Sequence, residues 1–278
     1  MSTRDVVSRE TSALLGRRQP EKVVSDLLVE RRGDVTWLRL NRPDRRNAYD
    51  LAMLESLVAA VNDVPRHDVL VVTGVEGSFC AGGALGNLAE PDENALRQLF
   101  YGSLELFDAL RAHPMPVIAS VNGPAVGGGN ELVVACDLAI AAESAFFGQT
   151  GPRVGSSPVL GGTNMLTMSI GEKRAKEVAF LCRRYPAREA LALGWINAVV
   201  ADDELEAETA RWAEELLAMS PRYLEISKLT SNVWWNACRE SYLSGLGMLV
   251  QAIGSPDMRE GAAAFVEKRA PNFRERSR

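Results

Sequence analysis

The sequence predicts an α/β fold with a largely parallel sheet. Strand-length apolar runs alternate with amphipathic helical stretches, as where Val69–Thr73 precedes the helical pattern of residues 91–112. The alternation continues through Met115–Val121 and Asp137–Ala142, and such an order is typical of parallel pairing. From about Glu204 onward the strand pattern is absent, so we expect a separate helical region at the C-terminal end.

The core should begin with a hairpin and a helix. Leu27–Glu30 and Val35–Leu40 have the pattern of two strands joined by a turn at Gly33, and Leu51–Val61 has helical apolar spacing. Residues 1–22 are polar and show little periodicity. This favours a mobile extension there over a short helix packed on a neighbour.

Composition and charge exclude several classes of function. The chain has 278 residues, 46% of them hydrophobic, which is enough for a full core and suits one large domain or one domain with a small appendage. A net charge of -5 without a long basic run argues against a nucleic-acid partner. No apolar stretch reaches membrane-spanning length and the N-terminus lacks a signal-peptide core, so we expect no membrane partner and a cytoplasmic location.

A metal site or an activated nucleophile is not expected. The four cysteines are widely separated without a CxxC pair, which is typical of reduced thiols rather than a zinc site or a disulfide framework. His67 and His113 lack metal-ligand spacing, so each should be structural or exposed. Ser156 and Ser157 do not form a G-x-S-x-G elbow.

Two glycine-rich turns follow two of the expected strands. Residues 77–85 follow Val69–Thr73, and residues 122–132, with three consecutive glycines, follow the central strand. Glycine leaves backbone N–H groups uncovered, and a helix N-terminus favours a developing anion. Two such turns in one sheet can direct two N–H donors to a single oxygen, which is the geometry of an oxyanion hole. The glycine spacing fits neither a dinucleotide fingerprint nor a P-loop, although a turn that only permits close packing is the alternative.

Together these two turns resemble the signatures of the crotonase (enoyl-CoA hydratase/isomerase) superfamily, and the resemblance extends from about Val24 to the C-terminus. It implies a core of ββα units coiled into a spiral over residues 23–203. It also implies a C-terminal helical region, residues 204–278, that builds a homotrimer or a dimer of trimers.

The resemblance further implies an acyl-CoA thioester as the substrate. The N–H groups of Gly83 and Gly128 match the donors that hold the thioester oxygen in this superfamily. Coenzyme A would then enter as part of the substrate, and no bound prosthetic group is expected. A thioester on the pantetheine arm of a carrier protein is the alternative to coenzyme A.

Glu131 is the candidate catalytic carboxylate. It follows Gly128 by three residues, about one helical turn, and so can face the same cavity. In enoyl-CoA hydratases a glutamate at this place acts on the attacking water, whereas the alternative is a first-turn carboxylate that only favours the helix N-terminus. The second hydratase glutamate falls on Gly151. Because one carboxylate would then have to serve as base and acid, ordinary fatty-acyl hydration is not favoured.

Residues 147–156 resemble the dihydroxynaphthoyl-CoA synthase branch, which carries out an intramolecular Claisen condensation. Ser156 matches a substrate-contacting serine there, and the glycine at position 151 can leave room for bicarbonate. The catalytic aspartate of that branch falls on Pro158, and its C-terminal tyrosine falls on Ile253. Naphthoate synthesis is therefore not expected.

Residues 155–162 are similar to the ring-cleaving 6-oxocyclohexene-carbonyl-CoA hydrolases, which keep a glutamate at the place of Glu131. We therefore expect water-dependent hydration or carbon–carbon bond hydrolysis of a cyclic or oxo-substituted acyl-CoA. Glu131 would handle the proton, and Ser156 or Ser157 would orient the substrate. Ordinary hydration or isomerisation, a Claisen- or Dieckmann-type condensation and a catalytically silent acyl-CoA-binding subunit stay open as alternatives.

Binding of coenzyme A is predicted at both ends of the sequence. Arg45 and Arg46 lie in a loop that resembles the phosphate-contacting loop of the family, although ordinary surface arginines are the alternative. Ala81 matches a backbone contact with the adenine. Lys268 and Phe273 match a C-terminal element that can reach coenzyme A in an adjacent subunit, and a solvated helix end is the alternative for Lys268.

Overall fold

The computed structural model describes residues 25–84 and 92–274, so the N-terminal extension expected over residues 1–22 lies outside the described residues. The strands are β1 (Leu27–Arg32), β2 (Val35–Leu40), β3 (Val69–Gly74), β4 (Val117–Val121), β5 (Ala125–Val126), β6 (Leu138–Ala142), β7 (Phe146–Gly148), β8 (Tyr185–Pro186) and β9 (Ala198–Val200).

The core contains helices α2 (Leu51–Asp63), α3 (Glu93–Ala112), α4 (Gly128–Ala135), α5 (Gly151–Val154), α6 (Met165–Ile170), α7 (Glu172–Leu181) and α8 (Ala187–Ala192), with a 3-10 helix η1 (Pro43–Arg45). After a second 3-10 helix, η2 (Asp202–Glu204), come α9 (Leu205–Leu217), α10 (Pro221–Ser231), α11 (Val233–Ala237), α12 (Arg239–Gln251) and α13 (Pro256–Val266).

The main sheet has six strands in the order β1-β2-β3-β4-β6-β9. β1 and β2 form an antiparallel hairpin, and every other pairing in this sheet is parallel. The α/β fold with parallel pairing is therefore confirmed. A second sheet, β5-β7-β8, is built from strands of two or three residues. These strands, like β9, are too short to give a periodic pattern in the sequence.

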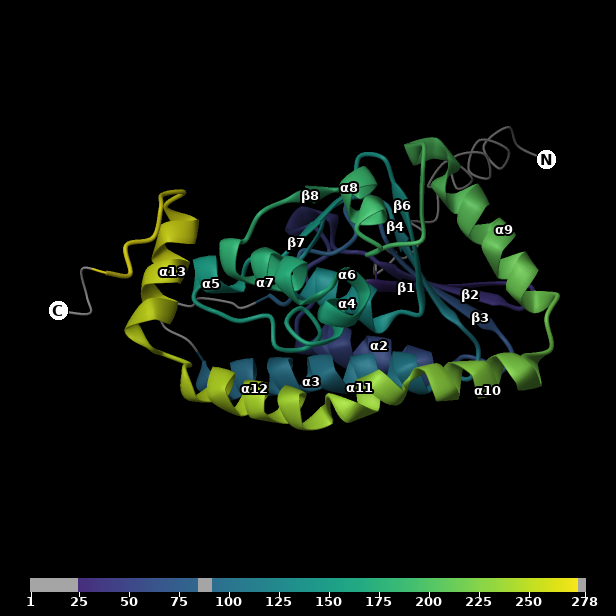
Figure 1. Cartoon of the computed structure of the whole chain (residues 1–278), viewed down its shortest axis with the longest axis horizontal. Helices are drawn as coiled ribbons and strands as arrows, with labels where there is room; N and C mark the ends of the chain where they lie inside the picture. The colour runs from purple at the N-terminus through teal and green to yellow at the C-terminus, as the bar shows by residue number, and fades with distance from the viewer. Residues whose placement is uncertain (1–24, 85–91, 275–278) are drawn as a thin grey trace, which may run out of the picture.

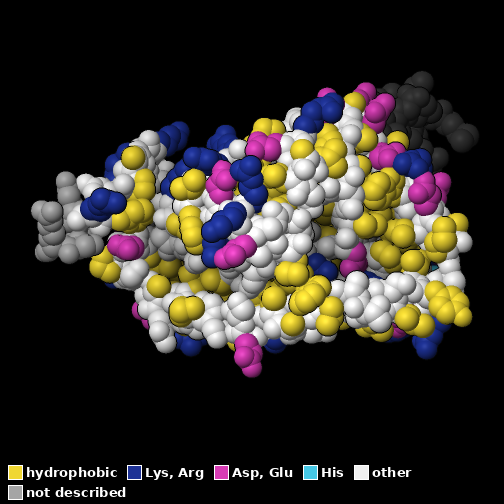
Figure 2. Space-filling model, viewed as in Figure 1, with side chains coloured by type: hydrophobic (Ala, Val, Ile, Leu, Met, Phe, Trp, Pro, Cys, Tyr) yellow, Lys and Arg dark blue, Asp and Glu magenta, His cyan; other side chains and the backbone are white. Residues whose placement is uncertain are grey.

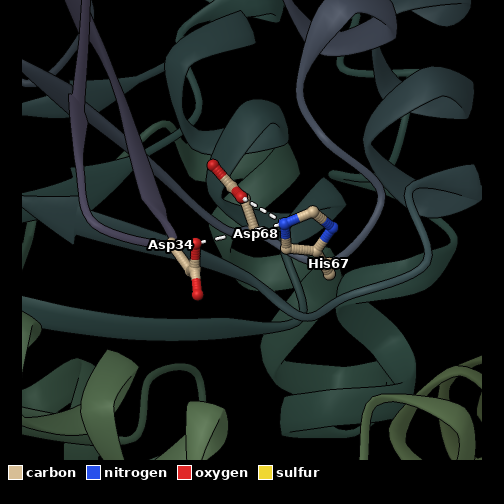
Figure 3. A group of neighbouring side chains, drawn as sticks. All are labelled: Asp34, His67 and Asp68. Atoms are coloured by element: carbon tan, nitrogen blue, oxygen red, sulfur yellow. Dashed lines mark ion pairs between the residues drawn. The ribbon is translucent and has the colours of Figure 1, made fainter.

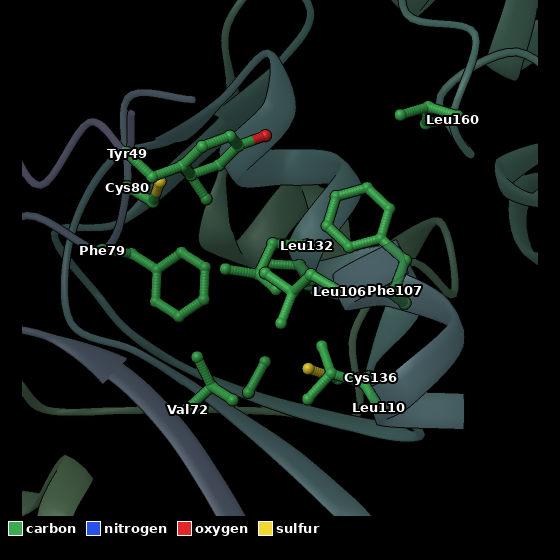
Figure 4. Packing of buried hydrophobic residues seen from close by; sticks show 14 of the residues in the cluster. Tyr49, Val72, Phe79, Cys80, Leu106, Phe107, Leu110, Leu132, Cys136 and Leu160 are labelled. Carbon is green, nitrogen blue, oxygen red and sulfur yellow. The ribbon is translucent and has the colours of Figure 1, made fainter. Parts of the chain in front are cut away.

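The main sheet is covered on both faces, which explains why β3 is buried along its whole length and is mostly apolar. Val69 and Val71 pack with Trp37 on the face that α9 covers. Leu70 and Val72 point to the opposite face, into the larger core beneath α2 and α3. Figure 4 shows Val72 in that core beside Phe79 and close to residues of α3 and α4.

The C-terminal region is helical from η2 onward within the described residues, as predicted. α10, α11 and α12 run almost end to end along one edge of the molecule, where α12 packs on α3 (Figure 1). α13 turns away and packs on α5. None of the helices in the described part of the chain combines the length and apolar character needed to cross a membrane.

Candidate active site

The turn after β3 and the turn after β4 lie side by side because these strands are parallel neighbours. Thr73 is paired with Ser120, and its hydroxyl donates to the Ser120 carbonyl at 2.7 Å. Just beyond the strand ends, the Gly74 N–H donates to Asn122 Oδ1 at 3.3 Å, and Asn122 Nδ2 donates to the Gly74 carbonyl at 3.0 Å. The amide of Asn122 therefore joins the two turns where they begin.

The two turns pack backbone against backbone. The Cys80 N–H donates to the Pro124 carbonyl, and the Val126 N–H donates to the Cys80 carbonyl, both at 3.1 Å. A Cβ on Gly129 would lie 2.0 Å from the Cys80 carbonyl oxygen, and one on Gly123 would lie 2.1 Å from the Gly77 carbonyl oxygen. Glycine is required at both places because any side chain would push the turns apart.

The backbone N–H groups of Gly83 and Gly128 lie close together in this contact. A Cβ on Gly128 would lie 3.3 Å from the Gly83 nitrogen, and a Cβ on Gly82 would lie 2.8 Å from the Gly128 nitrogen. No hydrogen bond of the described loops and turns takes up the Gly83 or the Gly128 N–H. Gly128 is the first residue of α4, so its N–H points out of the positive end of the helix. The pair can therefore donate to one ligand oxygen.

Glu131 lies one turn further along α4 and is buried, with 7% of its surface exposed. Its Oε1 accepts hydrogen bonds from the N–H groups of Leu160 at 2.7 Å and Gly162 at 3.3 Å. Burial raises the pKa of the Glu131 carboxyl to about 7, although these two N–H groups act in the opposite direction. The side chain can therefore accept or release a proton near neutral pH.

A cavity of about 1250 Å³ joins these groups. The predicted site residues that line it are Arg45, Arg46, Ala81, Gly83, Gly128, Glu131, Gly151, Ser156 and Ser157. Lys268 and Phe273 are not among the described residues that line this cavity; Lys268 is exposed just beyond α13 and Phe273 is half-buried. Their predicted contact with coenzyme A in an adjacent subunit stays a prediction.

Arg45 and Arg46 line the cavity. Arg45 is the last residue of η1, and Arg46 follows it. The Arg45 side chain is 62% exposed and lies 3.8 Å from the Asp44 carboxylate. The Arg46 carbonyl accepts a hydrogen bond from the Ala81 N–H at 3.0 Å. This bond joins the arginine loop to the turn that carries Gly83, so a ligand held by the arginines would extend toward the N–H pair.

Comparison with known proteins decides the family. A family model described as enoyl-CoA hydratase/isomerase matches residues 30–276. The chain belongs to this family. It is thus a crotonase-superfamily enzyme of acyl-CoA thioesters, with the mixed α/β fold of that superfamily.

Solved structures of the enoyl-CoA hydratase/isomerase family match nearly the whole chain. An enoyl-CoA hydratase from Mycobacterium avium subsp. paratuberculosis K-10 is 30% identical with a TM-score of 0.79, over 90% of this chain and 99% of that one. An enoyl-CoA hydratase from Bacillus anthracis is 33% identical with a TM-score of 0.71, again over 90% and 99%. An enoyl-CoA hydratase/isomerase from Pseudoalteromonas atlantica T6c is 27% identical with a TM-score of 0.80, over 90% and 100%.

This family member has no space for a side chain at position 151. Gly151 is buried, and a Cβ there would lie 2.9 Å from the Ser156 carbonyl oxygen and from both N and Cα of Ser157. The Ser156 N–H also donates to the Gly151 carbonyl at 2.8 Å, which closes the turn. A carboxylate at this position would therefore require the backbone of residues 151–157 to move.

Tyr49 and Gln149 are among the cavity residues that were not predicted from the sequence. Both are buried and line the cavity. The two amide atoms of the Gln149 side chain have no hydrogen-bond partner within the described residues. A Cβ on Gly162 would lie 2.5 Å from Gln149 Nε2, so this amide lies beside the loop that binds Glu131. Tyr49 belongs to no motif, and although Gln149 lies within residues 147–156, nothing in that segment singled out its side chain.

A group of possible metal ligands lies elsewhere, at the N-terminal ends of β2 and β3. Asp34, His67 and Asp68 place one ligand atom each within 4.8 Å of one another (Figure 3). Arg31 already pairs with both carboxylates, at 3.0 Å from Asp34 and 2.7 Å from Asp68. The guanidinium supplies the positive charge that this group needs, so we assign no metal to it. His113 is buried and bonds through Nε2 to the Asp68 carbonyl at 2.9 Å.

Substitution of Gly151 tests how tightly this turn is closed. Gly151→Ala should lower the free energy of unfolding by about 1–3 kcal/mol. Its methyl group would contact backbone atoms, which cannot move aside by changing rotamer as a side chain can. Gly247→Ala is the matched control, since Gly247 lies in α12 with open space around its Cβ position. The control should be neutral or stabilising. Equal stability changes for the two variants in urea unfolding would contradict the close packing.

The buried carboxyl of Glu131 should make stability depend on pH. Its pKa of about 7 in the folded state lies above the ordinary value of 4.5, so ionisation favours the unfolded state. The stability it contributes is complete below pH 4.5 and is lost as the pH rises through 7. Glu131→Gln should therefore be more stable than the wild type by under about 1 kcal/mol near pH 5 and by about 3 kcal/mol at pH 8.

Urea unfolding of both proteins across this pH range measures the difference. Glu214→Gln, on the exposed side of α9, is the control and should show no such trend. A Glu131→Gln difference that does not change with pH would show that the carboxyl is ionised with an ordinary pKa in the folded protein.

Proposed function

We propose that the protein uses Glu131 to activate water against a cyclic or oxo-substituted acyl-CoA, giving hydration or carbon–carbon bond hydrolysis. The observation that carries this proposal is a single buried carboxylate near a pair of backbone N–H groups that no hydrogen bond of the described loops and turns takes up. Of the described carboxylates that line the cavity, Asp44 and Glu267 are exposed and Glu131 alone is buried. The reaction would use no prosthetic group, and coenzyme A would enter as part of the substrate.

The N–H groups of Gly83 and Gly128 would hold the thioester oxygen. In the transition state this oxygen gains negative charge as an enolate forms, and each donor of such a pair typically contributes about 3–4 kcal/mol to the barrier reduction. Arg45 and Arg46 would bind the phosphates of coenzyme A, since a guanidinium matches phosphate oxygens, and the backbone at Ala81 would contact the adenine.

Carbon–carbon hydrolysis needs only one carboxylate. Glu131 would take a proton from water, and the resulting hydroxide would add to the ring ketone. The bond between the ketone carbon and the α-carbon then breaks, and its electron pair becomes the thioester enolate. Glu131 returns the same proton to the α-carbon, so the products are a carboxylic acid and an open-chain thioester. This cycle is consistent with the glycine at position 151.

The free amide of Gln149 favours a substrate with an additional polar oxygen. Buried amides are nearly always hydrogen-bonded, so a cavity that holds an unpartnered one suits a ligand that can satisfy it. An aliphatic fatty-acyl chain offers no such group, whereas a ring ketone does. Ser156 and Ser157, half-buried and exposed at the cavity, would orient the same part of the substrate.

Heavy-oxygen water distinguishes the proposed reactions. Purified protein would be incubated with crotonyl-CoA, 2-oxocyclohexane-carboxyl-CoA and a cyclic enone-carbonyl-CoA, and the products analysed by mass spectrometry. We expect heavy oxygen in a ring-opened product. A hydrated but intact product would favour ordinary hydration, and thioesters that bind but return unchanged would favour a silent binding subunit.

In the same assay Glu131→Gln should reduce turnover by roughly 10²–10⁴-fold while coenzyme A ester binding persists, because a general base is lost. The matched control, Glu214→Gln, should be as active as the wild type. Wild-type kcat/KM should rise with pH through about 7 as the Glu131 carboxylate forms.

We also propose that the protein assembles as a homotrimer or a dimer of trimers. Tyr223, Leu229, Trp234 and Met248 on α10–α12 are each more than half exposed, and Figure 2 shows apolar side chains at the surface along this edge. Such a surface is typical of a subunit contact. Light scattering should give three or six times the mass of one chain, and a monomer at micromolar concentration would contradict the proposal. The expected cytoplasmic location stays a prediction.

A further inference from the structure

The hydroxyl of Tyr49 lies beside the two N–H groups at the glycine turns. The point where a Cβ on Gly128 would stand is 2.2 Å from Tyr49 Oη and 3.3 Å from the Gly83 nitrogen. The phenol therefore occupies the space that the glycine at position 128 leaves open. Three potential donors, one hydroxyl and two backbone N–H groups, meet at this end of the cavity.

Both the backbone and the ring of Tyr49 are held in place by their neighbours. Its N–H donates to the Gly82 carbonyl at 3.0 Å, and its carbonyl accepts from the Ala84 N–H at 2.7 Å, so it is paired directly with the turn that carries Gly83. The ring is 2% exposed and packs in the larger core. In Figure 4 its hydroxyl points away from Phe79 and Cys80. Because the backbone and the ring of Tyr49 are both held, its hydroxyl has a fixed position in the cavity.

The phenol is held in its protonated form. Burial raises the pKa of Tyr49 well above its ordinary value, and the nearby Glu131 carboxylate acts in the same direction. Ser103, which also lines the cavity, acts on this pKa in the opposite direction as a hydrogen-bonding neighbour. At neutral pH the hydroxyl is therefore a donor, and an acyl oxygen with growing negative charge is the ligand that it suits.

We propose that Tyr49 donates a third hydrogen bond to the thioester oxygen, beside the N–H groups of Gly83 and Gly128. This inference rests on the proposed function, since it concerns the same oxygen. The bond strengthens as the oxygen gains charge, so it contributes more to the transition state than to substrate binding. Loss of the hydroxyl should therefore lower kcat and leave KM nearly unchanged.

The test is spectroscopic, so that it does not depend on which acyl group is the natural one. The probe is 4-(dimethylamino)cinnamoyl-CoA, whose absorption moves to longer wavelength when its thioester carbonyl is polarised. We expect wild-type protein to shift the bound probe to the red. Tyr49→Phe should bind it within about two-fold of the wild-type affinity but give a clearly smaller shift, and turnover should fall on the order of 10²-fold, as for a lost oxyanion-hole donor.

Two further variants make the result specific. Tyr101→Phe, on the surface of α3, removes a distant phenol and should leave the shift unchanged. A fluorinated tyrosine placed at position 49 keeps the ring and has a more acidic hydroxyl, so it should give a larger red shift. This second change keeps the test valid even if Tyr49→Phe does not fold.

The outcomes separate this inference from the proposed function. A folded Tyr49→Phe protein with the full wild-type shift, or a fluorinated protein with no change in shift, overturns the role of Tyr49 while the N–H pair stands. If the wild type binds the probe without any red shift, the polarising site itself is absent and both proposals fail. A reduced shift in Tyr49→Phe supports the third donor even if no tested thioester is hydrolysed.

Discussion

The direct contact between two backbone turns, 74–83 and 122–129, is the constraint on which the rest of the site depends. Parallel pairing of β3 and β4 brings the turns to one edge of the sheet, and the absence of a side chain at Gly123 and Gly129 lets the two backbones approach and bond to each other. Glycine loses more backbone entropy on folding than any other residue, so these turns carry an entropic cost. The buried Asn47 amide, which donates to the Val75 and Ser78 carbonyls, helps to offset this cost. The gain is a pair of N–H groups that face the cavity.

The same contact determines the chemistry of Glu131. Because α4 begins at the second turn, the carboxylate one helical turn later is carried into a buried position near the N–H pair. Two opposing effects act on it there. The N–H groups of Leu160 and Gly162 stabilise the anion, while desolvation destabilises it, and desolvation is the larger effect. A carboxyl that is neutral and ionised in similar amounts near pH 7 is suited to moving a proton in both directions.

Most of this arrangement could be predicted from the sequence, because strands β3, β4 and β6 are long apolar runs and the glycines of both turns are local features. The short strands β5, β8 and β9 could not be predicted, since two or three residues define no period. Tyr49 and Gln149 could not be predicted either. Nothing in their neighbouring residues indicates that Tyr49 Oη lies against Gly128 or that the Gln149 amide has no partner among the residues the structure describes. The grouping of Asp34 with His67 and Asp68 likewise arises from strand pairing.

The C-terminal region also restricts which side chains fit in the cavity, because two more glycines let α13 pack closely on the cavity wall. A Cβ on Gly155 would lie 2.4 Å from Met258 Cα, and one on Gly261 would lie 2.5 Å from the Gly155 nitrogen, so α13 is packed directly on the segment after α5. That segment carries Ser156 and Ser157 and leaves no space for a Cβ at position 151. A carboxylate introduced there by one substitution would therefore have to displace backbone that a helix from the other end of the chain holds in place. Of the described carboxylates that line the cavity, Glu131 is then the buried one, which is why the proposed mechanism assigns proton transfer to it.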